Sequence, residues 1–494
     1  MNMTNDRHCS ILQNIARRVM LERGLQPDFS KEALAELEQI TTAATMSGES
    51  IRDLRDLIWA SIDNDDSMDL DQLTVAESME DGKVKIRVAV ADVDALVHIW
   101  SPIDEDAAFN TTSIYTAAVI YPMLPEKLST NLTSLNPGED RLAVVVEMTV
   151  DKDGCVTDET IYRACVHNHA KLAYNSVAAW LDGEGEIPEP ITEVDGLAEN
   201  LRIQDDVAQK MKDFREMNGA LSLETIEARP VFDGEQIQNL EIESRNRAKE
   251  IIENVMIGAN GVTARYLSSK GFPSIRRVVR SPERWDRIVQ LAISHGYRLP
   301  DDPNSAALEA FLIKEKAKDP IRFPDLSLAI IKLMGNGEYV AQFPGQTAPG
   351  HFGLAVKDYS HSTAPNRRYT DLITQRLLKA ALEDSPVPYS NDDLDDLARH
   401  CTEQEDIVNK VERQIAKSAG ALLLQSRIGE RFDALVTGAS QKGTWARLLD
   451  IPVEGKLIRG YEGIDVGDKI RVELISVDVD RGFIDFRIAG MPRH

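Results

Sequence analysis

The sequence predicts an α+β protein built from three parts, and three patterns support this prediction. Apolar residues recur at helical spacing near the start, strand patterns alternate with long helical patterns in the middle, and short strands separated by Gly or Asp turns fill the end. A length of 494 residues also exceeds what one ordinary core supports. We therefore expect a helical N-terminal segment over residues 1–50, a mixed domain over residues 51–429 and a small β-barrel over residues 430–494.

The N-terminal segment is expected to contain two helices. In ILQNIARRVMLERG, Ile11, Ile15 and Val19 repeat near helical spacing, and Gly24 ends the pattern. Ser30 then fits the N-cap position of a second helix.

The middle part mixes strands and helices. The stretch VKIRVAVADV alternates in the manner of a half-buried strand, and RLAVVVEMTV predicts a more continuous one. The stretch NRAKEIIENVMIGANGVTARYL predicts a long helix. Residues 392–429 predict another helix, whose apolar stripe we interpret as packing.

The last part predicts a five-stranded antiparallel barrel of the OB type. Such barrels often bind single-stranded nucleic acid through one face, where bases stack on aromatic rings and cations contact phosphates. Phe432, Trp445 and Lys456 supply that chemistry, which makes single-stranded RNA a reasonable ligand. The alternative is a barrel that packs only against its own chain.

Composition bounds the class of protein further. No apolar run approaches the roughly 20 residues of a membrane span, and the polar start lacks the pattern of a secretory signal, so we expect a cytoplasmic protein without a membrane partner. The four cysteines are scattered, which argues against a zinc site or a disulfide framework. The net charge of −25 argues against a polyanionic partner, although a local basic channel can still bind phosphates.

The acidic stretch SIDNDDSMDLDQL is the first candidate site. In an extended MDLDQ segment, Asp69 and Asp71 point the same way and Leu70 faces the opposite side, while the turn formers NDDS can bring in Asp63. Oxygen ligands without Cys or His suit Mg²⁺, or Mn²⁺ as the alternative, and not zinc. Such ions support phosphodiester hydrolysis. The competing interpretation is a solvated acidic turn.

The stretch HSTAPNRRYTDL is the second candidate. Arg367 and Arg368 follow Pro365, so they begin on constrained, non-helical backbone. A guanidinium held there can grip a phosphate or stabilise charge on a transferred group. The alternative is a surface pair bound to acidic neighbours.

Tyr115 is a third candidate because it lies in a Thr- and Pro-rich stretch. An exposed ring there can stack on an unpaired base. From the residues alone, a buried tyrosine is the interpretation we favour.

Together these stretches resemble the ribonuclease II family, whose catalytic RNB domain is followed by an S1-type RNA-binding domain. The resemblance rests on SIDNDDSMDLDQL, VAVADVDALV, GALSLETIEARPVF, AKEIIENVMIGAN, HFGLAVKDYSHSTAPNRRYTDLITQRLL and the final VTGASQKGTWARL and VGDKIRVELISVDVDRGFIDF, in that order. It covers residues 55–490.

The resemblance implies a Mg²⁺-dependent exoribonuclease that degrades single-stranded RNA from its 3′ end to 5′-mononucleotides. The implied catalytic residues are Asp71 and Arg367, and Tyr115 would stack on the terminal nucleotide. From their residue types we predict further RNA contacts by Arg368, Trp445, Phe432 and Lys456. The implied metal site contains Asp63, Asp69, Asp71 and Gln72. Basic residues along the path would include Arg245, Arg247, Arg276, Arg277 and Arg280. We expect a monomer, and the sequence names no protein partner.

Two departures from the family pattern keep alternatives open. Gln72 stands where the family has a second adjacent Asp, and a neutral amide binds Mg²⁺ more weakly. An RNA-binding regulatory protein with weakened catalysis is therefore one alternative. About 50 helix-like residues stand where bacterial ribonuclease II has two cold-shock-type barrels. A ribonuclease of the same fold with a different end preference or direction is thus the other alternative.

Overall fold

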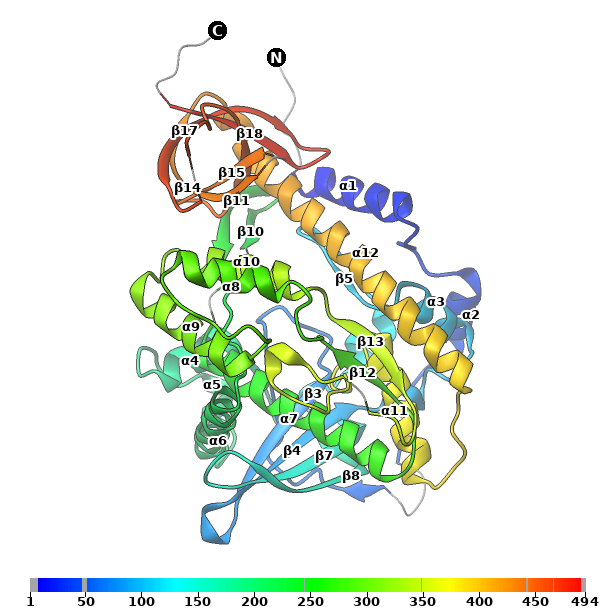
Figure 1. Cartoon of the computed structure of the whole chain (residues 1–494). Helices are drawn as coiled ribbons and strands as arrows, with labels where there is room; N and C mark the ends of the chain where they lie inside the picture. Colours follow the sequence, from blue (N-terminus) through cyan, green and yellow to red (C-terminus); the bar gives the residue numbers. More distant parts are fainter. Residues whose placement is uncertain are drawn as a thin grey trace.

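The computed structural model describes residues 8–46, 51–226, 228–243, 245–347, 349–440, 443–464 and 466–489. Figure 1 shows a broad mixed body, a small barrel at one end and a long helix, α12 (Asn391–Leu424), that runs from the body to the barrel. The expected α+β fold with N-terminal helices and a C-terminal five-stranded barrel is confirmed. Parts of the expected terminal segments, residues 1–7, 47–50 and 490–494, lie outside the described residues.

Twelve α-helices are assigned within those described ranges. In chain order they are α1 (His8–Glu22), α2 (Lys31–Gln39), α3 (Pro102–Asn110), α4 (Tyr174–Leu181), α5 (Glu189–Thr192), α6 (Leu197–Met217), α7 (Arg247–Ser269), α8 (Trp285–Ser294), α9 (Ser305–Lys318), α10 (Phe323–Met334), α11 (Tyr369–Leu382) and α12. None of the described helices has both the length and the apolar content of a membrane span.

A seven-stranded sheet forms the centre of the body. Its strands in spatial order are β1 (Arg52–Asp53), β8 (Val156–His167), β7 (Asp140–Val150), β4 (Val84–Ala91), β3 (Gln72–Ser78), β2 (Ala60–Asp63) and β9 (Ala170–Ala173). The central strands pair antiparallel, whereas the edge pairs β1–β8 and β2–β9 are parallel. The predicted strands at residues 84–90 and 141–150 thus lie side by side in the sheet.

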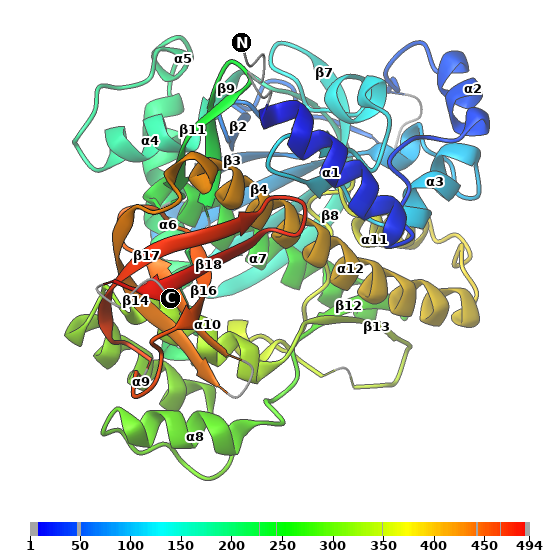
Figure 2. The ribbon, with the colours of Figure 1, turned by 90° about the horizontal axis from the view of Figure 1, so that it is seen from above.

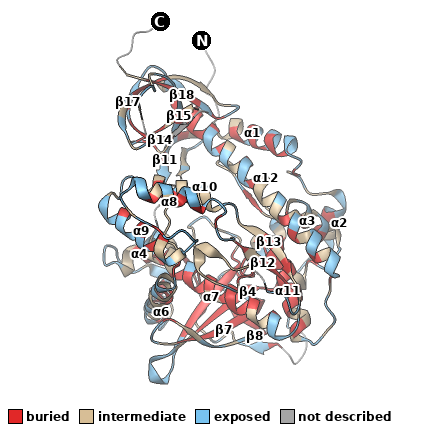
Figure 3. Ribbon diagram, in the orientation of Figure 1, coloured by how far each residue is buried: buried red, intermediate tan, exposed pale blue. Residues whose placement is uncertain are grey.

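Helices α6 and α7 pack against this sheet, and Figure 3 shows that the strands and much of α7 are buried. The sheet core is rich in Val and Ile because β-branched side chains suit a pleated, buried surface. In the described part of the chain, three two-stranded ribbons accompany it. They are β5 (Ile114–Tyr115) with β6 (Ile120–Tyr121), β10 (Ala228–Asp233) with β11 (Gln236–Ile242), and β12 (Ser274–Val278) with β13 (Glu338–Gln342).

The N-terminal helices pack on the outside of the body. Ser30 caps α2 as predicted, because its hydroxyl accepts the N–H of Ala33. Helix α1 lies alongside α12 in Figures 1 and 2, and its buried apolar face also contacts the β5–β6 hairpin. The predicted α12 stripe, which includes Val411 and Ile415, is used in this packing.

Helices α8, α9 and α10 form a lobe with its own apolar core, which we call the helical lobe (residues 285–334). Its buried residues include Trp285, Ile288 and Phe311. The lobe lies next to the barrel in Figure 1, and the ion pair between Arg447 of the barrel and Asp325 of α10 joins the two at 3.0 Å.

The barrel is closed, with the strand order β14–β15–β16–β18–β17. All neighbouring strands pair antiparallel except β16 and β18, which are parallel. The strands are β14 (Arg431–Ser440), β15 (Gly443–Leu448), β16 (Glu454–Arg459), β17 (Lys469–Asp478) and β18 (Phe483–Ile488). The C-terminal end of α12 packs on the barrel through Gly420, where a Cβ would lie only 3.1 Å from the Val453 side chain.

Candidate active site

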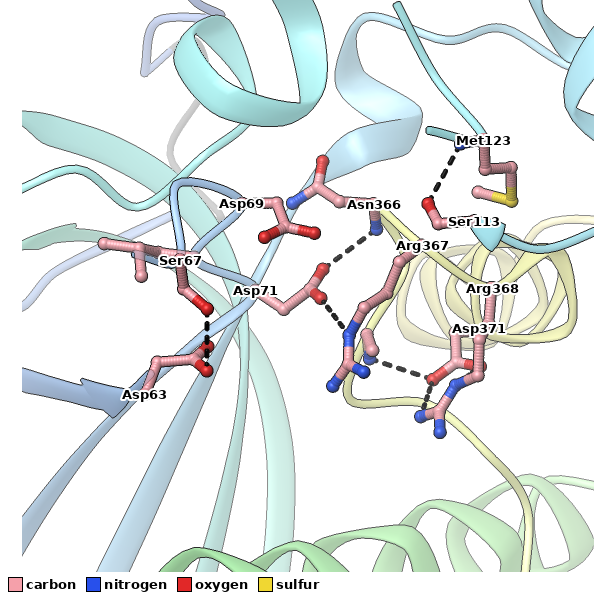
Figure 4. A network of polar contacts seen from close by, with 12 residues as sticks. Asp63, Ser67, Asp69, Asp71, Ser113, Met123, Asn366, Arg367, Arg368 and Asp371 are labelled. Carbon is pink, nitrogen blue, oxygen red and sulfur yellow. Dashed lines mark hydrogen bonds and ion pairs between the residues drawn. The ribbon is translucent and has the colours of Figure 1, made fainter. Parts of the chain in front are cut away.

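The acidic stretch forms the loop between β2, which ends at Asp63, and β3, which begins at Gln72. The Asp63 carboxylate caps the turn, because it accepts the N–H of Asn64 at 2.8 Å and the hydroxyl of Ser67 at 3.0 Å. The loop then returns so that Asp63, Asp69 and Gln72 line one cavity of about 550 Å³. Figure 4 shows the carboxylates of Asp63, Asp69 and Asp71 in one region, with the Asp71 carboxylate bonded to Asn366 and Arg367.

Asp71 is held by hydrogen bonds from Asn366 and Arg367, which lie far from it in the sequence. Its carboxylate accepts the backbone N–H of Asn366 and the Nε–H of Arg367, both at 2.9 Å, and the residue is 1% exposed. Leu70 is buried on the opposite side, as the alternation predicts, and its N–H donates to the hydroxyl of Ser134. The acidic stretch is therefore an ordered, partly buried loop and not a solvated turn.

Nearby positive charge compensates the carboxylates of Asp69 and Asp71 only in part. Burial raises the pKa of Asp71 to about 7, the Asp69 charge adds to this, and Arg367 opposes it. Burial also raises the pKa of Asp69, with a smaller contribution from the Asp63 charge. A cation bound between these groups would favour their ionised forms.

The donor set fits a hard divalent cation in its chemistry. Asp63, Asp69 and Gln72 present only oxygen ligands and amide nitrogen to the cavity, and Mg²⁺ prefers carboxylate and carbonyl oxygens. Among the described residues, no three Asp, Glu, His or Cys side chains lie close enough to hold one metal ion in this arrangement. The predicted metal role of Asp63, Asp69, Asp71 and Gln72 therefore stays a prediction.

Arg367 and Arg368 both line the cavity. Neighbouring side chains point to opposite sides of an extended backbone. Here the chain turns instead, because the N–H groups of both arginines bond to the carbonyl of Ala364, and both side chains reach the same cavity. Arg367 uses Nε for Asp71, and its side chain is 40% exposed. Arg368 forms a bidentate pair with buried Asp371, at 2.8 and 2.7 Å. These are positioned guanidinium groups rather than a loose surface pair.

Tyr115 lies at the cavity with 41% of its surface exposed, so the buried interpretation favoured from the residues alone is wrong. Its phenol donates a hydrogen bond to Asp69 at 3.1 Å, and its backbone N–H donates to Glu412 of α12 at 2.8 Å. Burial and the Asp69 charge raise the pKa of the Tyr115 phenol, which keeps the hydroxyl a donor.

The opposite wall of the cavity was missed in the sequence. Lys249, Glu253, Met256 and Asn260 line it from one face of α7. Their spacing of three, four or seven residues puts them on a single helix face. The polar residues Lys249, Glu253 and Asn260, at this spacing within an otherwise buried helix, are the signal that could have revealed this wall.

Two aromatic residues of the cavity were also missed, Tyr174 and Tyr359. Tyr174 lines the cavity together with Asp63, and burial and the Asp63 charge raise the pKa of its phenol. No local motif distinguishes these tyrosines from core residues.

The five arginines expected along the path all form ion pairs. Arg276 is 1% exposed and pairs with Asp358, and Arg277 pairs with Glu405. The remaining three also form ion pairs: Arg245 with Glu253, Arg247 with Asp205 and Arg280 with Glu338. None of the five is among the residues that line the cavity in the described part of the chain, and their place along an RNA path stays a prediction.

The barrel residues separate into two groups. Trp445 and Lys456 are register partners on β15 and β16, and both line a second cavity of about 410 Å³ together with Phe483. Phe432 instead is 6% exposed in the barrel core, with the Arg427 guanidinium 4.7 Å from its ring centre. Phe432 is therefore a packing residue in this structure and is not retained as an RNA contact.

The structure thus combines a carboxylate loop beside a fixed arginine, in an α+β domain, with a C-terminal five-stranded barrel. The model of the RNB domain matches residues 51–384, and the model of the RNase II-type exonuclease C-terminal S1 domain matches residues 430–489. The chain belongs to the RNB-domain family of ribonucleases II and R.

Curated relatives include two bacterial proteins named ribonuclease R. The one from Vibrio parahaemolyticus is 30% identical over 481 residues, which cover 89% of this chain and 56% of the relative. The one from Escherichia coli is 29% identical over 476 residues, which cover 89% of this chain and 58% of the relative. The chain thus spans somewhat more than half the length of these relatives.

Solved structures share the fold. A complex of Mycoplasma genitalium RNase R with ribose-methylated single-stranded RNA has a TM-score of 0.85 at 22% identity, covering 98% of this chain and 78% of that one. Yeast Ssd1, described as a pseudonuclease, has a TM-score of 0.73 at 17% identity, covering 95% of this chain and 57% of that one. The same fold is therefore found both in a ribonuclease and in a protein without nuclease function.

Proposed function

We propose that this protein is a Mg²⁺-dependent exoribonuclease that hydrolyses single-stranded RNA from the 3′ end and releases 5′-mononucleotides. The observation that carries the proposal is the cavity in which Asp63 and Asp69 lie beside buried Asp71 and its partner Arg367. Membership of the RNB-domain family and the naming of its relatives as ribonuclease R support the substrate class. The direction of attack rests on the family resemblance.

Asp63, Asp69 and Asp71, with Gln72 beside them, are the residues that would hold the metal. A bound Mg²⁺ would supply an activated water and neutralise charge on the phosphodiester. Mn²⁺ offers the same coordination chemistry and is the alternative ion.

Arg367 supplies the fixed positive charge of the site. Its Nε is committed to Asp71, which leaves the terminal guanidinium nitrogens to donate to the phosphoryl oxygens as charge develops. Because Asp71 and the backbone of residues 364–366 hold it, little reorganisation is needed during reaction.

Tyr115 positions both the substrate and a carboxylate. Its ring would stack on the terminal base, while its hydroxyl donates to Asp69 and so fixes that carboxylate. Arg368 and the Trp445 and Lys456 pair on the barrel are proposed as further contacts to the RNA backbone and bases.

The second candidate is an RNA-binding protein with weak or no turnover. Gln72 favours it, because this neutral residue lines the cavity where the family pattern has an acidic ligand. The similarity in fold to a pseudonuclease makes this alternative specific.

One experiment separates the candidates. Single-stranded RNA labelled separately at its 5′ and 3′ ends is incubated with the protein in Mg²⁺, Mn²⁺ or EDTA, and products are resolved over time. Mononucleotides released only from the 3′ label, and only with metal, support the proposal. Binding without cleavage in either metal supports the second candidate, and release from the 5′ label overturns the direction.

A further inference from the structure

A cavity of about 900 Å³ lies between the helical lobe and the barrel, and it shares no lining residue with the cavity of the candidate active site. We call it the lobe–barrel groove. One wall is formed by α8 and α10 and the other by the barrel, through Thr437 of β14 and Glu454 of β16. The Arg447–Asp325 ion pair, with both side chains 14% exposed, fixes the two walls relative to each other.

Three cations face this groove: Arg284 and Arg287 at the start of α8, and Lys332 on α10. All three are exposed, and no ion pair or side-chain hydrogen bond involves them within the described ranges. Most other arginines discussed above are paired with carboxylates. Unpaired cations gathered at one cavity, in a chain with a net charge of −25, indicate an anionic ligand.

The acidic residues of the groove do not cancel this charge. Asp325 is neutralised by Arg447, and Glu454 accepts a hydrogen bond from the hydroxyl of Thr437 at 2.7 Å. The remaining negative charges of the groove lining are those of Asp286 and Glu454, and they face the three positive charges named above. The net charge of the groove lining is therefore positive. Because the three cations are exposed and separate, they suit several phosphate groups along a strand rather than one buried anion.

The floor of the groove is apolar. It is formed by side chains of α8 and α10, namely Leu291, Leu328, Ala329 and Leu333. Leu328 is 38% exposed, which leaves apolar surface open to a ligand. Phosphates on a cationic rim and base or ribose faces on an apolar floor are the two requirements of a single strand.

The groove also continues onto the barrel face. Glu454 lines both the groove and the second cavity that contains Trp445 and Lys456. The two cavities therefore meet at the start of β16. Trp445 and Lys456 line one of them, and the three cations line the other. An extended ligand could occupy both, whereas a mononucleotide would fill only one.

We propose that the lobe–barrel groove is a binding surface for single-stranded RNA, in which Arg284, Arg287 and Lys332 contact phosphates of the segment outside the catalytic cavity. The choice of RNA rests on the proposed function. The groove lets the helical lobe and the barrel grip one strand together, so that affinity grows with RNA length.

The test compares two double variants of equal charge. Arg287→Gln with Lys332→Gln removes one groove cation from each helix. Arg298→Gln with Lys314→Gln removes two exposed cations of the same part of the chain that do not line the groove. Thermal unfolding of both variants establishes that each is folded before binding is measured.

Binding of a fluorescent 20-nucleotide single strand and of a 6-nucleotide strand is measured by anisotropy in EDTA at several salt concentrations. For the groove variant we expect an affinity for the long strand about tenfold lower, and a salt dependence shallower by about 1.4 in log Kd against log salt, from two lost phosphate contacts. In the same variant, the ratio of the affinity for the 20-nucleotide strand to that for the 6-nucleotide strand should be smaller than in the wild type.

Equal affinities and equal salt dependence in the two variants would overturn the inference. Because binding is measured without metal, the result is separate from turnover. A protein that fails to cleave RNA in Mg²⁺ but shows the groove effect would refute the proposed function and support this inference.

Discussion

Arg367 Nε donates a hydrogen bond to Oδ2 of Asp71 at 2.9 Å, across 296 positions of the sequence. This bond joins the acidic loop after β2 to the segment before α11, and the buried carboxylate thereby fixes the guanidinium at the cavity. The reactive arrangement depends on this contact because each partner is positioned by the other.

Arg367→Lys is expected to lower kcat/KM on single-stranded RNA by about 100-fold, because an ammonium cannot both bond Asp71 and present a planar pair of donors to the phosphate. Steady-state kinetics on a labelled RNA measures the effect. The matched control is Arg399→Lys, an exposed arginine on α12 that pairs with Asp396. A loss shared by the control would argue against a specific role for Arg367.

Gln72→Asp is expected to lower the Mg²⁺ concentration for half-maximal activity by about tenfold, because it adds a charged oxygen ligand beside Asp69. The same change adds a like charge to a cation-poor site, so the melting temperature should fall in EDTA and recover in Mg²⁺. Metal titrations of activity and of thermal unfolding check both effects. An unchanged metal dependence would remove Gln72 from the site.

Tyr115→Ala is expected to weaken RNA binding by about 1 to 3 kcal/mol through the loss of base stacking, and to change the length of the final product. Tyr115→Phe keeps the ring and loses only the hydrogen bond to Asp69, so it should bind RNA almost normally while turning over more slowly. Anisotropy and product sizing on gels separate the two. Equal RNA affinities of the Tyr115→Ala variant and the wild type would contradict base stacking on Tyr115.

The fold should lose stability in mild acid through His351. Burial, with the nearby Arg277 charge, lowers the pKa of His351 to about 4, and its Nδ1 accepts the N–H of Leu354. Below the unfolded value of 6.5 the unfolded chain binds a proton that the folded chain does not, so stability falls as pH drops from 6.5 towards 4.

At pH 5 this difference amounts to at most about 2 kcal/mol. The raised pKa of Asp71 acts in the opposite direction, so the measurement is a comparison of variants. Urea unfolding at pH 7.5 and pH 5 should show a smaller loss for His351→Gln than for wild type. Identical losses would mean that His351 does not contribute.

Local pattern was sufficient for some features and not for others. The alternation around Leu70 predicted which side of the acidic loop is buried, and the Ser30 cap followed from residue type. The partner of Asp71 could not be predicted, because spacing within one stretch carries no information about a segment 296 positions away.

The sequence around Phe432 contains a signal of its burial. It alternates with exposed Arg431 and Asp433 along β14, so the period of two assigns its ring to the barrel interior. Trp445 follows the same rule on β15, where its neighbours Thr444 and Ala446 are buried and it is not. The aromatic type alone did not distinguish the two.

The most direct test of the central claim is a time course with 3′-labelled single-stranded RNA, comparing wild type, Asp71→Asn and Asp65→Asn with and without Mg²⁺. Asp65 is an exposed residue of the same loop and serves as the matched control. We predict release of labelled mononucleotide by wild type and Asp65→Asn in Mg²⁺ only, and at least about a 100-fold slower release by Asp71→Asn. Hydrolysis by Asp71→Asn at the wild-type rate, or hydrolysis that persists in EDTA, would contradict a metal-assisted site built on these carboxylates.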